Sequence, residues 1–391
     1  MPDGKHVEIE VFHETKDGES VCGDECKVAR LEGDSRFIVV LSDGLGSGIK
    51  ASLLANMTAT MALMFVEENM DIVESAETIM DTLPVCEVRK ISYATFTIID
   101  SCVSGATRII EMGNPEYLHL RGGVEIEHAK RSMASSNWPD RQLLVSEFKT
   151  EPEDRLIIFS DGLTQAGLGT HEFKFGWRRK GCFECARDAI MKRPDISARE
   201  LSRLLVKQAT LKNSPPGCAD DMTCAVVYIR IPRRLLLLTG PPFRQENDSE
   251  YARLVQSFAG RKIICGGTTA EIVARELGRK VKTDWRKYKG PLPPSSEMEG
   301  VDLITEGILT LTETARQLEE NEPVDVPEPV AQFIEMLHES DIIDIVVGTR
   351  VNEAHQDPRL PVDLEIRRNI IKRIKTSLED KFLKKVNVRY I

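Results

Sequence analysis

The sequence has no long apolar run and no excess of positive charge. No stretch approaches the roughly 20 apolar residues that a membrane-spanning helix needs, and residues 1–16 contain no apolar signal-peptide region. The formal net charge of −10 disfavours nucleic acid and anionic membranes as main partners, because both would repel the protein. We therefore expect a cytoplasmic protein that binds neither.

The cysteines show no pattern typical of a disulfide framework. There are nine, an odd number, and several lie in apolar segments, such as Cys102, Cys224 and Cys265. This scatter predicts reduced thiols. Cys182 and Cys185 form one C-x-x-C pair with no second pair to match it, so packing is the preferred interpretation. A zinc or redox site is the alternative.

The length of 391 residues predicts two domains, since a single core of this size is unusual. Residues 1–232 show many short strand patterns with turn signals and grouped helices, which indicates an antiparallel α+β domain. In residues 233–391, short apolar runs are each followed by Gly or Pro and then by helical sequence. This alternation predicts a smaller α/β domain with a parallel sheet.

One stretch of the first domain places a carboxylate beside three glycines. Ser42-Asp43-Gly44-Leu45-Gly46-Ser47-Gly48 follows an apolar strand pattern at 37–41 and precedes a helical pattern at 49–68. We expect that helix to bury a face formed on or near Leu53, Leu54, Met57, Met61 and Met64. Alone, Asp-Gly at a strand end is usually a turn.

Three more acidic sites share this setting at the ends of expected strands. Asp24 follows Gly23 before one strand, Asp161-Gly162 ends another, and Asp220-Asp221 directly precedes the strand expected at 222–231. Carboxylates at adjacent strand ends can converge on one edge of a sheet pair, where their mutual repulsion raises their pKa values. A divalent cation removes that conflict, and an all-oxygen set favours Mg²⁺ or Mn²⁺ over zinc.

These motifs, in this order, resemble those of metal-dependent type-2C (PPM) Ser/Thr protein phosphatases. The motifs are Gly23-Asp24, Asp43-Gly44-Leu45-Gly46-Ser47-Gly48, Ser160-Asp161-Gly162 and Asp220-Asp221-Met222-Thr223, and they are most similar to the bacterial stage II sporulation protein E-like branch. The resemblance covers about residues 5–232. It implies an α-β-β-α sandwich of two antiparallel sheets with a binuclear Mn²⁺ or Mg²⁺ centre at one end.

The resemblance also implies roles for individual residues. Asp43 would bridge both metals, the backbone carbonyl of Gly44 would bind one, and Asp161 and Asp220 would bind the other. Asp24 would bind a metal or position a coordinated water. The implied catalytic residues are thus Asp24, Asp43, Asp161 and Asp220, and the implied metal ligands are these four with Gly44. His6 and His13 lie near the expected place of a general acid but suit strand positions, so the general acid stays unassigned.

The implied activity is phosphoserine and phosphothreonine protein phosphatase in a bacterial regulatory switch. Water bound to the two metals would attack the phosphate ester, and we find no signature of a cysteine-based phosphatase. By resemblance, the substrate would be a phosphoprotein such as an anti-sigma-factor antagonist. Two alternatives stay open: a non-catalytic signalling module that senses a ligand or partner through residues 233–391, and a two-metal phosphoesterase of small molecules.

The second domain carries no nucleotide-binding fingerprint. Gly266-Gly267-Thr268-Thr269-Ala270 follows an expected strand and opens a helix, where backbone N–H groups are placed to bind an anion. Thr268 is the expected cap of that helix. A small ligand at this domain and a scaffold or homodimer role both stay open.

Overall fold

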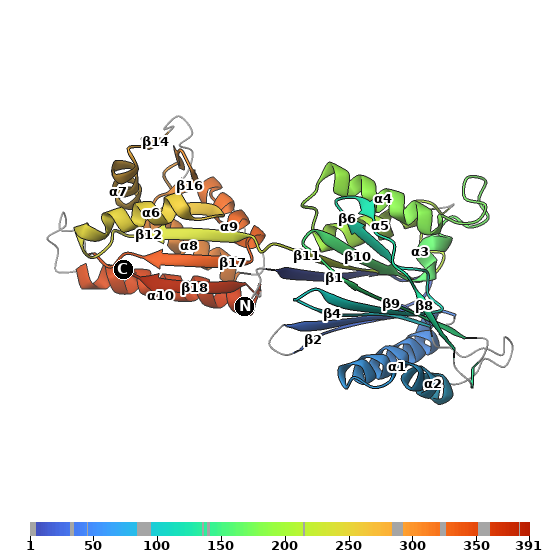
Figure 1. Cartoon of the computed structure of the whole chain (residues 1–391). Coiled ribbons are helices and arrows are strands. Elements are labelled where there is room, and N and C mark those ends of the chain that lie inside the picture. The colour runs from blue at the N-terminus through green and yellow to red at the C-terminus, as the bar shows by residue number, and fades with distance from the viewer. Residues whose placement is uncertain are drawn as a thin grey trace. The chain divides into compact units, whose positions relative to one another are not determined.

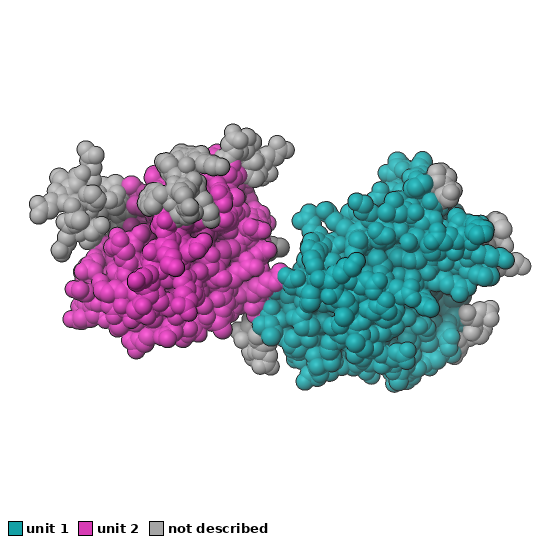
Figure 2. Space-filling model, turned by 90° about the horizontal axis from the view of Figure 1, so that it is seen from above, with its two compact units in different colours: residues 1–231 teal, residues 232–391 magenta. Residues whose placement is uncertain are grey.

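The structure, a computed structural model, describes the backbone of residues 5–31, 35–44, 46–83, 95–134, 137–138, 141–213, 216–283, 292–320, 326–350, 360–382 and 384–391. The chain divides into two compact units, residues 1–231 and 232–391, which Figure 2 colours separately. The sequence places this boundary one residue later, after residue 232. Each unit is described by itself.

The first unit is built on two antiparallel sheets, visible in Figure 1. One sheet has the order β1 (His6–Glu14), β11 (Met222–Arg230), β10 (Asp154–Phe159), β6 (Leu118–Arg121) and β7 (Val124–Glu125). The other has the order β2 (Glu25–Leu31), β3 (Arg36–Ser42), β4 (Phe96–Cys102), β5 (Ala106–Met112), β9 (Gln142–Lys149) and β8 (Arg131–Ala134). Buried side chains of both sheets form one core between them, including Val39 and Leu41 of β3 with Leu156 and Ile158 of β10.

Helices cover the outer face of each sheet. α1 (Gly48–Glu67) and α2 (Ile72–Thr82) pack on the β3–β4–β5 side, and α3 (Asp161–Gln165), α4 (Arg178–Lys192) and α5 (Ala198–Thr210) pack on the other side (Figure 1). Each sheet is therefore buried on both faces, which explains the unbroken apolar runs of its central strands. The expected α-β-β-α arrangement is confirmed.

The expected buried face of α1 is only partly confirmed, because Leu54 is buried and Met61 packs partly buried against the core. Leu53 and Met64 are more than half exposed, whereas the helix buries mainly small residues, with Leu54 and Val66 beside them: Gly48, Ala51, Leu54, Ala55, Thr58, Ala59, Ala62 and Val66. Small side chains allow the helix axis to approach the sheet closely. Leu53, Met57 and Met64 are exposed instead, so the buried face is selected largely by the small size of its residues.

Within the described residues, one helix, α1, is long and apolar enough to cross a membrane by length and composition alone. Of its most apolar window, 39% is buried inside the protein. Those buried residues pack against the sheet, as expected of a helix that belongs to the core of this unit.

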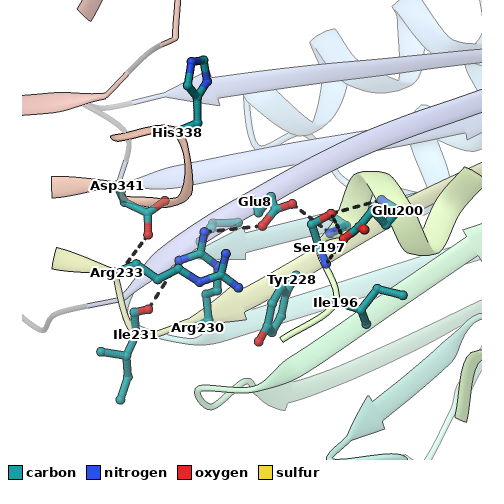
Figure 3. A network of polar contacts seen from close by, with 12 residues as sticks. Glu8, Ile196, Ser197, Glu200, Tyr228, Arg230, Ile231, Arg233, His338 and Asp341 are labelled. Atoms are coloured by element: carbon teal, nitrogen blue, oxygen red, sulfur yellow. Dashed lines mark hydrogen bonds and ion pairs between the residues drawn. The ribbon is translucent and has the colours of Figure 1, made fainter. Parts of the chain in front are cut away.

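A polar network ties β1, β11 and α5 together (Figure 3). Glu8 Oε1 accepts a hydrogen bond from the Ala198 amide at 2.8 Å, and Glu8 Oε2 lies 3.5 Å from the Arg230 guanidinium. Ser197 and Glu200 form a capping box that begins α5. Arg230 ends β11, so this network anchors the end of the strand opposite to Asp220.

The C-x-x-C pair belongs to the core. Cys182 and Cys185 lie on α4, where Cys182 is fully buried among apolar residues. Burial raises the pKa of the Cys182 thiol to about 12, so it stays protonated at neutral pH. The eight cysteines in the described ranges are all free, which agrees with the prediction of reduced thiols.

The second unit contains a mixed, mostly parallel sheet, as the sequence predicts. Its order is β14 (Lys282–Thr283), β15 (Ser296–Met298), β16 (Val301–Thr305), β13 (Arg261–Cys265), β12 (Arg234–Thr239), β17 (Ile342–Val347) and β18 (Lys385–Tyr390). The strands from β16 to β18 are parallel, and β14 and β15 add an antiparallel edge. The helices are η1 (Gln245–Asn247), α6 (Asp248–Ser257), α7 (Gly267–Leu277), α8 (Ile308–Glu319), α9 (Glu328–Glu339) and α10 (Leu360–Asp380). The sequence pattern predicts none of the strands β14, β15 and β18.

Candidate metal centre

Strand register brings the acidic sites of the first unit to one edge of the sandwich. Glu25 pairs with Ser42, so Asp24 before β2 and Asp43 after β3 lie at the same end of that sheet. In the other sheet Phe159 pairs with Cys224, and the Ser160 amide donates to Thr223 O at 3.0 Å. Asp161 after β10 and Asp220 before β11 therefore lie at the same end of this second sheet.

The segments that carry these acids approach one another closely at two glycines. A Cβ atom at Gly44 would lie 2.5 Å from the carbonyl oxygens of both Gly23 and Ala51. A Cβ at Gly162 would lie 2.1 Å from the carbonyl oxygen of Asp221. Only glycine, which has no Cβ, allows these approaches, and this explains why glycine follows the aspartate in both Asp-Gly motifs.

Neighbouring groups position the acids. Asp161 Oδ2 accepts a hydrogen bond from Gln165 Nε2 at 2.6 Å, and the Thr95 hydroxyl donates to the backbone oxygen of Asp43 at 2.7 Å. Asp221 Oδ1 accepts from the Lys16 amide at 3.0 Å, and Lys16 Nζ lies 3.9 Å from Asp220 Oδ1. The amide and the single ammonium only partly offset the gathered negative charge.

At this edge, burial and neighbouring negative charges raise the pKa values of three carboxylates. Burial raises the pKa of Asp43 to about 9, and the charges of Asp24 and Asp161 act in the same direction. Burial also raises the pKa of Asp24 to about 7; the hydroxyls of Ser160 and Thr223 oppose this, while Asp221 and Asp161 add to it. The pKa of Asp220 is raised chiefly by burial. Without a compensating cation, burial therefore favours the protonated form of each of these groups.

The donor set suits a hard divalent cation. It consists of carboxylates, and the buried oxygens Asp24 Oδ2 and Asp221 Oδ2 have no hydrogen-bond partner among the described residues. No three acidic, histidine or cysteine side chains of the described ranges converge closely enough to hold an ion as they stand.

Each implied site residue therefore lies at this edge: Asp24, Asp43, Gly44, Asp161 and Asp220. Sequence reasoning missed Lys16 and Gln165, which contact the acids from outside the motifs and carry no sequence signal of their own. Ser160 and Thr223 lie within the motifs, but the sequence predicts no role for their hydroxyls.

Both candidate histidines lie on β1, as their strand-like setting predicts. His13 pairs with Thr223 at the acidic end of the strand, and His6 pairs with Arg230 at the far end.

The first unit is thus a two-sheet sandwich with helices on both outer faces and an acidic cluster at one edge. Comparison with protein families matches residues 33–230, just over half of the 391 residues, to Stage II sporulation protein E (SpoIIE). The chain belongs to this family and carries its phosphatase domain.

Solved structures match a similar share of the chain. One is the phosphatase domain with a regulatory-domain fragment of SpoIIE from Bacillus subtilis, 20% identical over 58% of this chain and 64% of that chain, with a TM-score of 0.47. This chain thus spans less than two thirds of that structure's length. A search of curated proteins gave no match.

Two further similar structures contain divalent metals. RsbX in complex with magnesium is 19% identical over 57% of this chain and 96% of that chain, with a TM-score of 0.41. The catalytic domain of the serine/threonine phosphatase PstP, with two manganese ions, is 11% identical over 58% of this chain and 99% of that chain, with a TM-score of 0.37.

Proposed function

We propose that the first unit is a Mn²⁺- or Mg²⁺-dependent phosphoserine and phosphothreonine protein phosphatase. The observation that carries this proposal is the convergence of four acidic motifs, distant in sequence, on one edge of the sandwich. Membership of the SpoIIE family supports the same activity.

Asp43, Asp161, Asp220 and the carbonyl oxygen of Gly44 are the groups that would hold two divalent cations, with Asp24 beside them. When bound, the cations supply positive charge that activates a water and offsets the charge on the phosphoryl oxygens. The chain's own contribution is positioning. Gln165 orients Asp161 through its 2.6 Å hydrogen bond, and Thr95 fixes the Asp43 backbone through its hydroxyl.

The test is hydrolysis of p-nitrophenyl phosphate by the full chain, with Mn²⁺ and with EDTA. We expect Mn²⁺-dependent turnover in the wild type and its loss in Asp43→Asn and Asp161→Asn. Asp188→Asn is the matched control, because Asp188 is an exposed residue of α4 whose side chain pairs with its neighbour Arg187. Absence of Mn²⁺-dependent turnover in the wild type, or full activity in both site variants, would refute the proposal.

We further propose that the substrate is a phosphoprotein in a bacterial regulatory switch, such as an anti-sigma-factor antagonist. Comparing a phosphoserine peptide with nucleotides and sugar phosphates separates this from a small-molecule phosphoesterase. Faster turnover of the peptide is expected, whereas a preference for nucleotides or sugar phosphates would contradict the proposed substrate class.

We also propose a cytoplasmic location. The free thiols of the described residues support it, because such cysteines persist in a reducing compartment. Recovery of the protein in the membrane or extracellular fraction of the cells that produce it would contradict this location.

A further inference from the structure

In the second unit, glycines gather at the carboxyl edge of the parallel sheet. Gly240, Gly266 and Gly348 directly follow β12, β13 and β17, and Gly307 comes two residues after β16. A Cβ at Gly307 would lie 3.6 Å from the Cα of Gly266, so the loops after β16 and β13 are in contact. The carboxyl edge of such a sheet is where small ligands commonly bind.

The first turn of α7 leaves its backbone donors unused. Gly266 is the N-cap residue, with φ at 127° and no side-chain cap, so the expected cap at Thr268 is wrong. The first helical hydrogen bond runs from the Ala270 amide to Gly266 O at 3.0 Å. The amides of Gly267, Thr268 and Thr269 therefore have no intrahelical acceptor, and no partner for them is found among the described residues.

A buried hydroxyl points to the same place. The Thr269 side chain is 1% exposed, and its Oγ1 has no hydrogen-bond partner in the described part of the chain. This oxygen would lie 3.4 Å from a Cβ atom on Gly266, at the open end of the helix. A buried hydroxyl without a partner costs free energy, so its position beside unused amides indicates a ligand.

The neighbouring helix α8 also has a buried hydroxyl without a partner in its first turn, that of Thr310, but its backbone donors differ from those of α7. At the first turn of α8, the Leu309 amide donates to the Glu306 carboxylate at 3.1 Å, so that helix start already has its own anion. At α7, Gly266 and Gly267 leave that space free of side chains, and a Cβ at Gly267 would meet no atom within 4 Å. Arg367 places a cation at this edge of the sheet, because its Nη1 lies 3.5 Å from the carbonyl oxygen of Gly348, which follows β17.

We propose that the first turn of α7 binds the phosphate group of a small molecule. The amides of Gly267, Thr268 and Thr269 and the Thr269 hydroxyl supply four donors, which suit the several oxygens of one phosphate. The helix dipole favours its charge, and the absence of a side chain at Gly266 permits close approach. This site lies in the second unit and is independent of the proposed phosphatase activity.

The test is peptide-resolved hydrogen–deuterium exchange of the full chain in EDTA, with inorganic phosphate as the probe against sodium chloride of equal ionic strength. EDTA removes divalent cations from the acidic edge of the first unit. Because exchange is followed peptide by peptide, protection at α7 is distinguished from protection at that acidic edge. At a phosphate concentration ten times its Kd, exchange of the amides at 267–269 is expected to slow about tenfold. Equal exchange in phosphate and chloride, even at molar phosphate, would overturn the proposal.

Two pairs of variants separate binding from folding. Gly267→Pro removes one amide donor at the first helical position, where proline is favoured, and Gly267→Ala keeps that donor. Thr269→Val removes the hydroxyl with little change of shape, and Thr314→Val removes a hydroxyl that is likewise buried and without a partner, but on α8. We expect the phosphate Kd to rise tenfold or more in Gly267→Pro and Thr269→Val relative to their controls. Equal Kd values within both pairs would overturn the proposal.

Comparing the binding of ribose 5-phosphate with that of inorganic phosphate shows whether the site recognises a phosphorylated metabolite or phosphate itself. Tighter binding than inorganic phosphate, lost in Gly267→Pro, supports a phosphorylated metabolite. Equal binding of both, lost in the same variant, supports recognition of phosphate itself. Protection by ribose 5-phosphate that persists in Gly267→Pro and Thr269→Val would contradict the site.

Discussion

Replacing Gly44 with alanine tests whether close approach of the backbone assembles the acidic edge. Contacts of Cβ atoms below 3.0 Å essentially do not occur, and this Cβ would lie 2.5 Å from the carbonyl oxygens of Gly23 and Ala51. Each oxygen must therefore retreat by at least 0.5 Å, the difference between these two distances. Both belong to backbone, before β2 and within α1, and cannot rotate away. Overpacking of this kind costs about 1–3 kcal/mol.

Because the displaced segments adjoin Asp24 and Asp43, we expect Gly44→Ala to lose Mn²⁺-dependent hydrolysis as well as stability. For a unit of this size, the cost corresponds to a melting temperature lowered by roughly 2–12 °C. Calorimetry and the p-nitrophenyl phosphate assay measure the two effects.

The control is Gly122→Ala, in the turn between β6 and β7. There φ is +56° and no atom lies within 4 Å of the added carbon, so only backbone strain is introduced. This variant should lose stability and keep its activity. Wild-type melting and turnover in Gly44→Ala would refute the reasoning.

Two further predictions concern the core and a buried ion pair. In urea unfolding, Leu54→Ala should lower the free energy of unfolding by about 2–5 kcal/mol, because Leu54 is only 5% exposed. Leu53→Ala should lower it by less than about 0.5 kcal/mol, because Leu53 is 59% exposed. Equal losses would contradict the orientation of α1. Although burial alone would raise the pKa of Asp154, its contact with His119 Nε2 at 3.1 Å and its hydrogen bonds with Arg121 lower it to about 2. Its stabilisation, ~2 kcal/mol, is therefore present above the unfolded pKa near 4 and lost as the pH falls through about 2. Asp154→Asn should remove this part of the pH dependence of unfolding, and an unchanged profile would contradict it.

The gathering of the acidic residues follows from sequence because strand ends can be located. The apolar run that ends at Leu41 and the one that starts at Met222 fix where β3 ends and β11 begins. Once the strands pair, Asp43 and Asp220 are carried to the same edge. The motif order then distinguishes this arrangement from unrelated turns, which a single Asp-Gly could not do.

Other features depend on packing that the sequence pattern does not contain. The orientation of α1 is set by how closely a helix rich in alanine approaches the sheet, so a search for large apolar residues selects a face that is only partly buried. Lys16 and Gln165 reach the acids from a loop and a short helix. Strand β18 lies at the sheet edge with a mostly exposed, charged pattern, and only its pairing with β17 makes it a strand.

The most direct test of the central claim is a crystal of the full chain grown with Mn²⁺ and measured at the manganese absorption edge. The account predicts two anomalous peaks at the edge formed by Asp43, Gly44, Asp161 and Asp220, and their loss in Asp43→Asn. A fully occupied Mn²⁺ site elsewhere, with no peak among these residues, would contradict it.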